Sequence, residues 1–231
     1  MVKRLFMACL AALALSAQAA PVSFVDALFE ATAVATTDGV PGFDMQSGPP
    51  SELPVLAEAD SIGLTTDIAL AGAIGGPGLL STSADVSGAS GIASAVATAR
   101  FTGSFATTGL LSLSIDFAPV TFADGAGSAA TSLFVSLVSG GVTLFQDYVT
   151  GPWTFEYTQA AGATSLLDLT LSSEATVGFP TAGVGNAVTS GLVSFAVSPV
   201  PLPATWLLFL GGLGPIAAAV RVRRAAQAPA G

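Results

Sequence analysis

The middle of the sequence predicts an all-β domain, an antiparallel β-sandwich or jelly-roll-like fold, and two observations indicate it. Apolar and polar residues alternate with a period of two, as they do in strands with one buried and one wet face. Gly and Pro interrupt these segments about every 10 to 15 residues, a spacing typical of short strands joined by turns. We therefore expect one exported β domain, flanked by an N-terminal signal helix and a C-terminal transmembrane helix.

Alternation is clearest in 111–117, where Leu111, Leu113, Ile115 and Phe117 share one face. The same pattern predicts strands in 153–158, 167–172 and 192–197. Two shorter apolar runs, 133–138 and 142–145, are separated by Ser139-Gly140-Gly141, which is a hairpin signal.

Two regions are less regular. The segment 83–99 is rich in Ala, Ser and Val, and Gly88 and Gly91 favour loop and strand over a helix. Residues 20–59 contain several acids and five prolines, four of them at 41–54, so we expect an extended, loop-rich lead with a possible first strand at 22–29. The sandwich itself is assigned to 60–198.

The N-terminus has the three parts of a secretory signal. Lys3 and Arg4 precede an apolar stretch, and Ala17-Gln18-Ala19 provides the small-x-small pattern that signal peptidase accepts. Cleavage after Ala19 makes 1–19 the signal peptide. The one cysteine, Cys9, lies inside the apolar stretch, so the mature chain contains no thiol for a disulfide or a metal site.

The C-terminus contains an uncharged stretch, 204–220, followed at once by Arg221, Arg223 and Arg224. As a helix, this stretch is about 25 Å long, at the short end of what crosses a bilayer. The arginines predict that its end stays in the cytoplasm while the acidic middle lies outside. Pro215 and three glycines weaken this helix. Residues 225–231 are expected to be disordered.

Val200-Pro201-Leu202-Pro203, an apolar helix with an early Trp206, and an arginine cluster together resemble the PEP-CTERM sorting signal over 199–224. The resemblance implies that an exosortase, an integral-membrane cysteine protease, recognises Pro201, Leu202 and Pro203 and releases or transfers the protein outward. Leu202 stands where the commonest form of the motif has Glu. The first four residues of a sortase signal are also matched by 202–205, but Trp206 replaces the required Gly.

The sequence contains few side chains that could act in catalysis. Without His, a Ser-His-Asp triad and a His-based zinc site are impossible. A pair of carboxylates remains open, because glycosidases use only two acids. The candidates on or near strands are Asp116, Asp147, Glu156, Asp168 and Glu174. We expect them to be solvated.

Three other features receive structural interpretations. We expect Arg100 to pair with an acid, and Trp153 and Tyr157 to fill the core rather than form a sugar platform. Asp124-Gly125-Ala126-Gly127 is interpreted as a turn rather than a calcium loop.

The distribution of charge excludes nucleic-acid binding. Five of the six cations lie at the chain ends, which leaves Arg100 alone among fifteen carboxylates in the middle. Such a surface repels nucleic acid.

We therefore expect a non-enzymatic surface or extracellular-matrix structural protein without cofactors, associated with biofilm or exopolysaccharide. Its export partners would be the Sec machinery, signal peptidase and an exosortase. It would be a transiently anchored intermediate in the inner membrane of a Gram-negative bacterium, and then reach the cell surface or matrix. The alternatives are a secreted carbohydrate-binding module, a carboxylate-dependent glycosidase, and a membrane-anchored protein that is never cleaved.

Overall fold

The computed structural model describes residues 21–49, 54–63, 67–88, 91–178 and 184–200. Within these residues all the regular structure is β. The strands are β1 (Val25–Thr37), β2 (Val40–Gly48), β3 (Val55–Ile62), β4 (Ile68–Gly76), β5 (Leu79–Gly88), β6 (Ala93–Phe105), β7 (Gly109–Gly125), β8 (Gly127–Ser139), β9 (Val142–Val149), β10 (Trp153–Gln159), β11 (Ser165–Val177) and β12 (Gly185–Pro199).

The expected sorting elements lie outside the described residues. They are the signal peptide 1–19 with Ala17 and Ala19, the motif Pro201, Leu202 and Pro203, the helix 204–220, the arginines Arg221, Arg223 and Arg224, and the segment 225–231.

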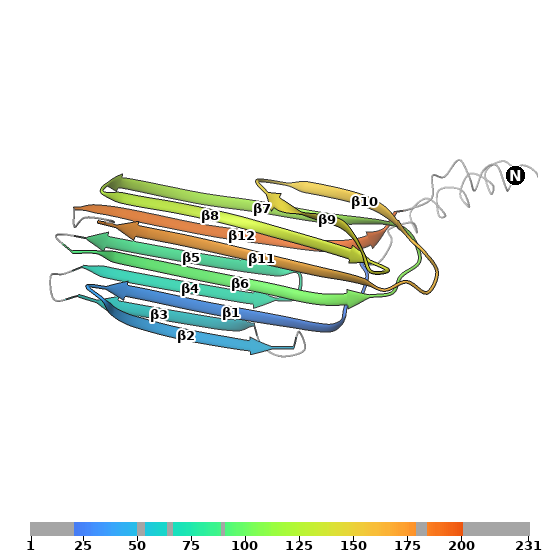
Figure 1. The fold of residues 1–231 in the computed structure, drawn as a ribbon, viewed down its shortest axis with the longest axis horizontal. Coiled ribbons are helices and arrows are strands. Elements are labelled where there is room, and N and C mark those ends of the chain that lie inside the picture. The colour runs from blue at the N-terminus through green and yellow to red at the C-terminus, as the bar shows by residue number, and fades with distance from the viewer. Residues whose placement is uncertain (1–20, 50–53, 64–66, 89–90, 179–183, 201–231) are drawn as a thin grey trace, which may run out of the picture. The chain divides into compact units, whose positions relative to one another are not determined.

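The strands form two six-stranded antiparallel sheets, which confirms the all-β antiparallel prediction (Figure 1). Sheet A has the order β2-β1-β6-β11-β8-β9, and sheet B has the order β10-β7-β12-β5-β4-β3. Side chains in contact across the two sheets, described below, make the arrangement a β-sandwich. Residues Pro21–Pro199 form one compact unit.

The predicted alternation is confirmed where large apolar residues carry it. Leu111 and Leu113 are fully buried in β7, and Leu169 and Leu171 are fully buried in β11. The predicted hairpin is also present, because β8 pairs with β9 across Gly140 and Gly141.

The expectation for 20–59 is wrong in its loop-rich part, because β1, β2 and β3 all lie in this segment. The buried face of β1 consists largely of Ala31, Ala33 and Ala35, and alanine contrasts little with the Thr and Val residues between them. Pro41 lies in β2, an edge strand, where a missing N–H is tolerated. The sandwich therefore begins near Pro21 rather than at residue 60.

The segment 83–99 divides as predicted. β5 ends at Gly88 and β6 begins at Ala93, so the segment contributes to two strands, and none of its described residues is helical.

The core is uneven along the strands. Alanines from β1, β3, β4 and β6 fill one part of it, while Phe29, Phe101 and Phe105 fill another. Small residues allow close approach of the backbones at the β2–β3 edge. A Cβ added at Gly42 would overlap the backbone oxygen of Asp60, so these two strands from different sheets touch main chain to main chain.

A chain of hydroxyl groups crosses the core between the sheets. Thr82 Oγ1 of sheet B lies 2.7 Å from Ser173 Oγ of sheet A, which lies 3.1 Å from Thr131 Oγ1. Thr131 in turn bonds to Thr189 of sheet B, whose hydroxyl also donates to the carbonyl oxygen of Val120 at 3.2 Å. These polar groups are thus satisfied without water.

The first and last described segments meet at one end of the sandwich. The Val22 N–H donates to the carbonyl oxygen of Val197 at 2.7 Å. Next to this bond, the Phe24 ring packs edge-on against Phe101 and Phe105, with ring centroids 5.0 and 5.4 Å away. We call this the terminal end of the sandwich.

Candidate functional site

The five candidate carboxylates are dispersed over four strands. Asp168 and Glu174 both lie on β11, six residues apart, which corresponds to about 20 Å along a strand. Glu156 on β10 pairs with Ser112 on β7. Ser112 precedes Asp116 by four residues, so Glu156 and Asp116 are separated by about 13 Å in the strand direction. Both separations exceed the roughly 5 to 9.5 Å that a glycosidase carboxyl pair needs.

Asp147 lies on β9 opposite Val135, and its Oδ1 accepts the N–H of the next residue, Tyr148, at 2.7 Å. Asp116 and Glu156 are exposed. The structure therefore brings no two of these five carboxylates together as a catalytic pair, and most of them lie on the solvent-facing sides of the sheets.

Arg100 is paired, as expected. On β6 it lies between β1 and β11, and its Nε and Nη2 donate to the two carboxylate oxygens of Asp168 at 3.1 and 2.6 Å. Its Nη1 reaches Glu30 at 3.5 Å. The hydrogen bonds to Asp168 are the main cause that raises the Arg100 pKa. The cation is thus engaged in a surface ion-pair network.

The segment Asp124–Gly127 is a turn, as expected. Gly125 has φ +57°, and a Cβ added there would overlap the backbone oxygen of Val184. Asp124 Oδ1 accepts the backbone N–H of Asn186 at 2.7 Å. This carboxylate therefore ties the start of β12 to the end of β7.

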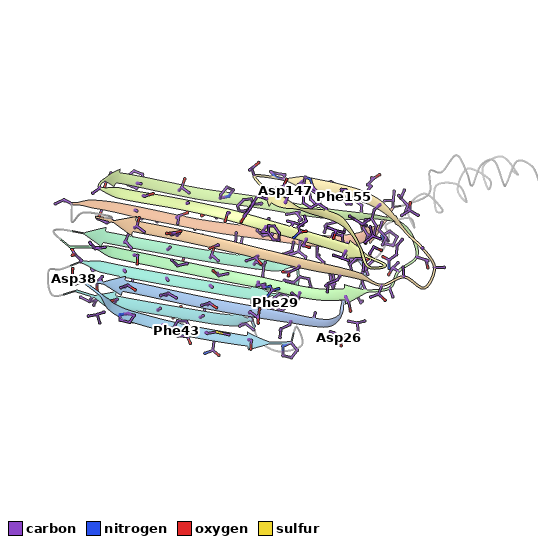
Figure 2. The ribbon with its side chains drawn as sticks, in the orientation of Figure 1. Asp26, Phe29, Asp38, Phe43, Asp147 and Phe155 are labelled. Atoms are coloured by element: carbon purple, nitrogen blue, oxygen red, sulfur yellow. The ribbon has the colours of Figure 1, made fainter. Side chains whose placement is uncertain are left out.

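The aromatic residues of β10 line the edge between β9 and β10, near which Figure 2 labels Phe155. Tyr157 is buried, as expected, and burial raises the pKa of its phenol. Trp153 is only half-buried and packs against the core, with Phe155 stacked on it at 5.5 Å and Phe145 at 4.4 Å between ring centroids. The rings therefore cover one another's faces.

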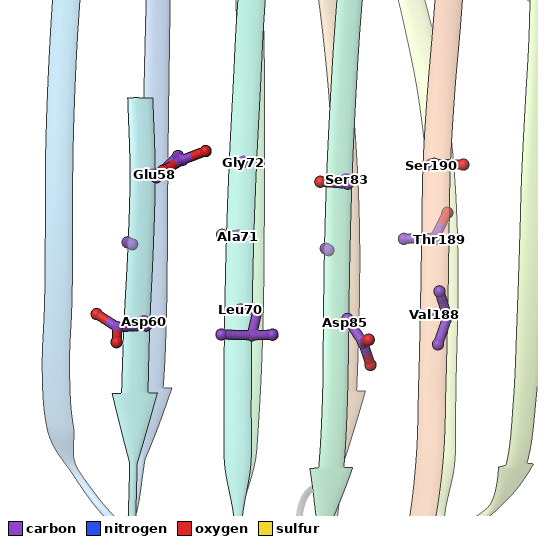
Figure 3. A pocket seen from close by; sticks show the side chains of 12 residues that line it. Glu58, Asp60, Leu70, Ala71, Gly72, Ser83, Asp85, Val188, Thr189 and Ser190 are labelled. Atoms are coloured by element: carbon purple, nitrogen blue, oxygen red, sulfur yellow. The ribbon is translucent and has the colours of Figure 1, made fainter. Parts of the chain in front are cut away.

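The structure adds a feature that the sequence interpretation missed, a shallow groove of about 690 Å³ across the outer face of sheet B. Its row of small residues runs from Gly72 through Ser83 to Ser190 on neighbouring strands, with Glu58 at one end (Figure 3).

One side of this groove carries two carboxylates. In the adjacent row, Asp60 and Asp85 flank Leu70, and Val188 continues the row on β12. The alternation in 55–62 was the available signal, but the prolines around it masked the strand.

The described residues hold no group of three or more His, Cys, Asp or Glu side chains placed to bind a metal ion. Nor do they include any helix with the length and hydropathy needed to cross a bilayer.

No protein-family model matches the chain, and no curated protein matches it. Among solved structures, the chain is similar to the GH31 alpha-xylosidase from Xanthomonas citri, with 8% identity and a TM-score of 0.20. The match covers 79% of this chain and 33% of the enzyme, so the chain spans about a third of that enzyme's length. A likeness this low assigns no activity.

Proposed function

We propose that the chain is a non-enzymatic passenger protein of the bacterial surface or extracellular matrix, delivered by a signal peptide and released by an exosortase. The recognised residues are Pro201, Leu202 and Pro203. The sandwich acts as a rigid structural module and not as a catalyst.

One observation carries this proposal. The compact unit begins at Pro21 and ends at Pro199, next to the expected cleavage after Ala19 and the expected sorting tail from residue 199. Two features derived from sequence alone thus border the domain closely. An arrangement of signal, folded domain and tail supports delivery of the domain as a passenger.

The structure of the surface supports the same function. Arg100 is held in an ion-pair network, Asp124 ties two strands, and the five candidate acids are dispersed. Arg100 and Asp124 thus form contacts that hold strands together, and the acids are too far apart to act as a catalytic pair. This arrangement favours a stable structural module over an active site.

The test is the intact mass of the protein in the membrane and medium fractions of its own organism. We expect a released form that begins at Ala20 and ends near Pro203. Replacing Pro201, Leu202 and Pro203 by alanine together should retain the chain in the membrane, whereas Pro152→Ala should not. Full-length mature chain in every fraction would refute processing.

The groove on sheet B favours a second function, a carbohydrate-binding module. Acids, hydroxyls and apolar side chains alternate along it, and glycans use such mixed contacts. If it binds sugar, then Asp60→Asn and Asp85→Asn should abolish signals on a glycan array, while Glu174→Gln on the other sheet should not. An array without any signal for the unmodified protein would exclude this alternative.

A further inference from the structure

Several edges of the two sheets are covered by other parts of the sandwich. On one side, the edge strands β2 and β3 touch main chain to main chain. The carboxylate of Asp44 on β2 also accepts the N–H of Glu58 on β3 at 3.2 Å. On the other side, the ring of Phe145 on β9 packs against Trp153 on β10, with ring centroids 4.4 Å apart. Such cover matters because the unpaired N–H and C=O groups of an exposed edge can pair with another chain.

The second half of β7 forms an edge that β10 does not cover. β10 pairs only with 109–115, the part of β7 nearest the terminal end. β9 likewise pairs only with 133–139 of β8. Within the described residues, 116–125 therefore has a neighbouring strand in its sheet on one side alone, namely β12 (Figure 1). We call 116–125 the open edge.

The side chains of the open edge are exposed on both faces of the sheet. Val120 and Phe122, on the outer face, are 66% and 57% exposed. Pro119, Thr121 and Ala123 have the phase of the buried positions earlier in β7, yet they are exposed as well. A groove of about 410 Å³, lined in part by Pro119 and Thr121, lies between the open edge and β8. A further strand along this edge would cover both sets of side chains.

The open edge is complementary to itself in one antiparallel register. When Thr121 lies opposite Thr121 of a second copy, Val120 lies opposite Phe122 of that copy. The two Val–Phe pairs then form one apolar cluster on the outer face, because residues directly opposite each other share a face. Asp124 lies opposite Ala118 in this register, so no two carboxylates face each other.

The neighbouring registers are less favourable. Apolar residues stay on the same face only when the second copy is shifted in steps of two residues. One such step places Asp116 opposite Asp124, and like charges directly opposite each other are destabilising. A step in the other direction places Asp124 opposite Val120. The favoured register pairs 117–125 of both copies and leaves β10 in place on 109–115.

We propose that two copies of the chain associate through the open edge, with β7 of one copy paired antiparallel to β7 of the other about Thr121. The two copies of sheet B then form one continuous sheet. The occupant is a second copy because one register of the same segment joins apolar side chains and separates the acids. Pro119 has no N–H, so each copy forgoes at most one hydrogen bond of the new ladder. This association does not depend on the export proposed above.

Disulfide cross-linking tests the register. Cys9 is the one cysteine of the sequence, so the full chain with Cys9→Ser accepts a single cysteine at a chosen position. In the proposed register, the Cα atoms of the two residues 121 lie about 4.5 to 5.5 Å apart, a distance that a disulfide bridges. The two residues 118 are offset by about 20 Å along the strands, which is too far.

After mild oxidation of the dilute protein in detergent, we expect several-fold more disulfide-linked dimer from Thr121→Cys than from Ala118→Cys. Adding Val120→Lys to Thr121→Cys should lower the dimer yield several-fold, because the lysine would face Phe122 of the second copy. Leu56→Lys replaces an exposed apolar residue at the far edge of the same sheet, so this matched control should leave the yield unchanged. Circular dichroism of each variant checks that the sandwich is folded.

Three results would overturn the proposal. Equal dimer yields from cysteines at 118 and 121 would show association without this register, and no dimer from either would show that the edge stays unpaired. Equal losses from Val120→Lys and Leu56→Lys would show association through the face of sheet B rather than its edge. The processing of the tail is measured separately by intact mass, so either proposal can fail without the other.

Discussion

At the level of single residues, hydroxyl groups connect the two sheets through the interior. Thr82 and Ser173 lie 91 residues apart in sequence and meet at 2.7 Å in the core. A buried hydroxyl without a partner is costly, whereas the satisfied pair contributes only modestly. The chain of hydroxyls therefore discriminates strongly against misaligned sheets.

We predict that Ser173→Ala lowers the free energy of unfolding by about 1 to 3 kcal/mol, because it leaves the Thr82 hydroxyl buried without its partner. Adding Thr82→Val should restore part of this loss, since valine has the shape of threonine and no polar atom to satisfy. Urea denaturation of the two single variants and the double variant measures the effect. Simple additivity of the single losses would contradict the prediction.

A second residue-scale prediction concerns alkaline stability. Burial raises the pKa of Tyr157 above its unfolded value of about 10. The folded state then holds the phenolic proton more tightly than the unfolded state, so stability is lost as the pH rises from about 10 through the folded pKa.

Tyr157→Phe should flatten this alkaline loss. Urea midpoints measured between neutral pH and pH values above 10 provide the comparison. Tyr148→Phe, at an exposed ring, is the matched control. A Tyr157→Phe variant that loses stability as steeply as the unmodified protein would argue against the explanation.

At the level of elements, strands were predictable where bulky residues mark the buried face. In β7 the buried positions are Leu, Ile and Phe, and in β11 they include three successive Leu at 167, 169 and 171, so the period of two is clear. In β1 the buried positions are largely Ala, which is also common in helices and loops, so the sequence pattern indicated only the start of the strand, within 22–29, and not its extent to Thr37. The missed groove follows from this, because one wall of it lies on β3 in the same misassigned segment.

The β8–β9 hairpin offers an element-scale prediction. Gly141 has φ +80°, and a Cβ there would have open space around it. Gly141→Ala should therefore destabilise the protein by about 1 kcal/mol for conformational reasons alone. Gly151→Ala, also in open space but without a positive φ, should change stability little. Thermal or urea unfolding of the two variants measures the difference. Equal losses of unfolding free energy in both variants would contradict the conformational explanation.

At the level of the whole molecule, sheet membership was beyond sequence reasoning. β7 and β8 are joined by a turn as short as a hairpin loop, yet they belong to different sheets. Local residues set the turn, whereas the partners of each strand depend on contacts far away in sequence. The dispersal of the five acids follows from that same long-range order and could not be read from alternation.

The domain boundary leads to a prediction about the C-terminal tail. Val197 is the last buried apolar residue of β12, and the compact unit ends at Pro199. A chain of residues 20–200 should therefore unfold at the same urea midpoint as a chain of residues 20–231, compared in the same detergent. A midpoint lowered by the truncation would show that the tail contributes to the fold.

The place of β12 also has a consequence for the timing of assembly. This strand lies between β7 and β5 in the interior of sheet B, although it is the last strand of the domain. Until β12 is in place, β7 and β5 cannot be joined, and sheet B lacks the strand between them. Folding that depends on such distant partners is slow. If the chain is exported as we propose, we therefore expect it to remain unassembled until its translocation is nearly complete.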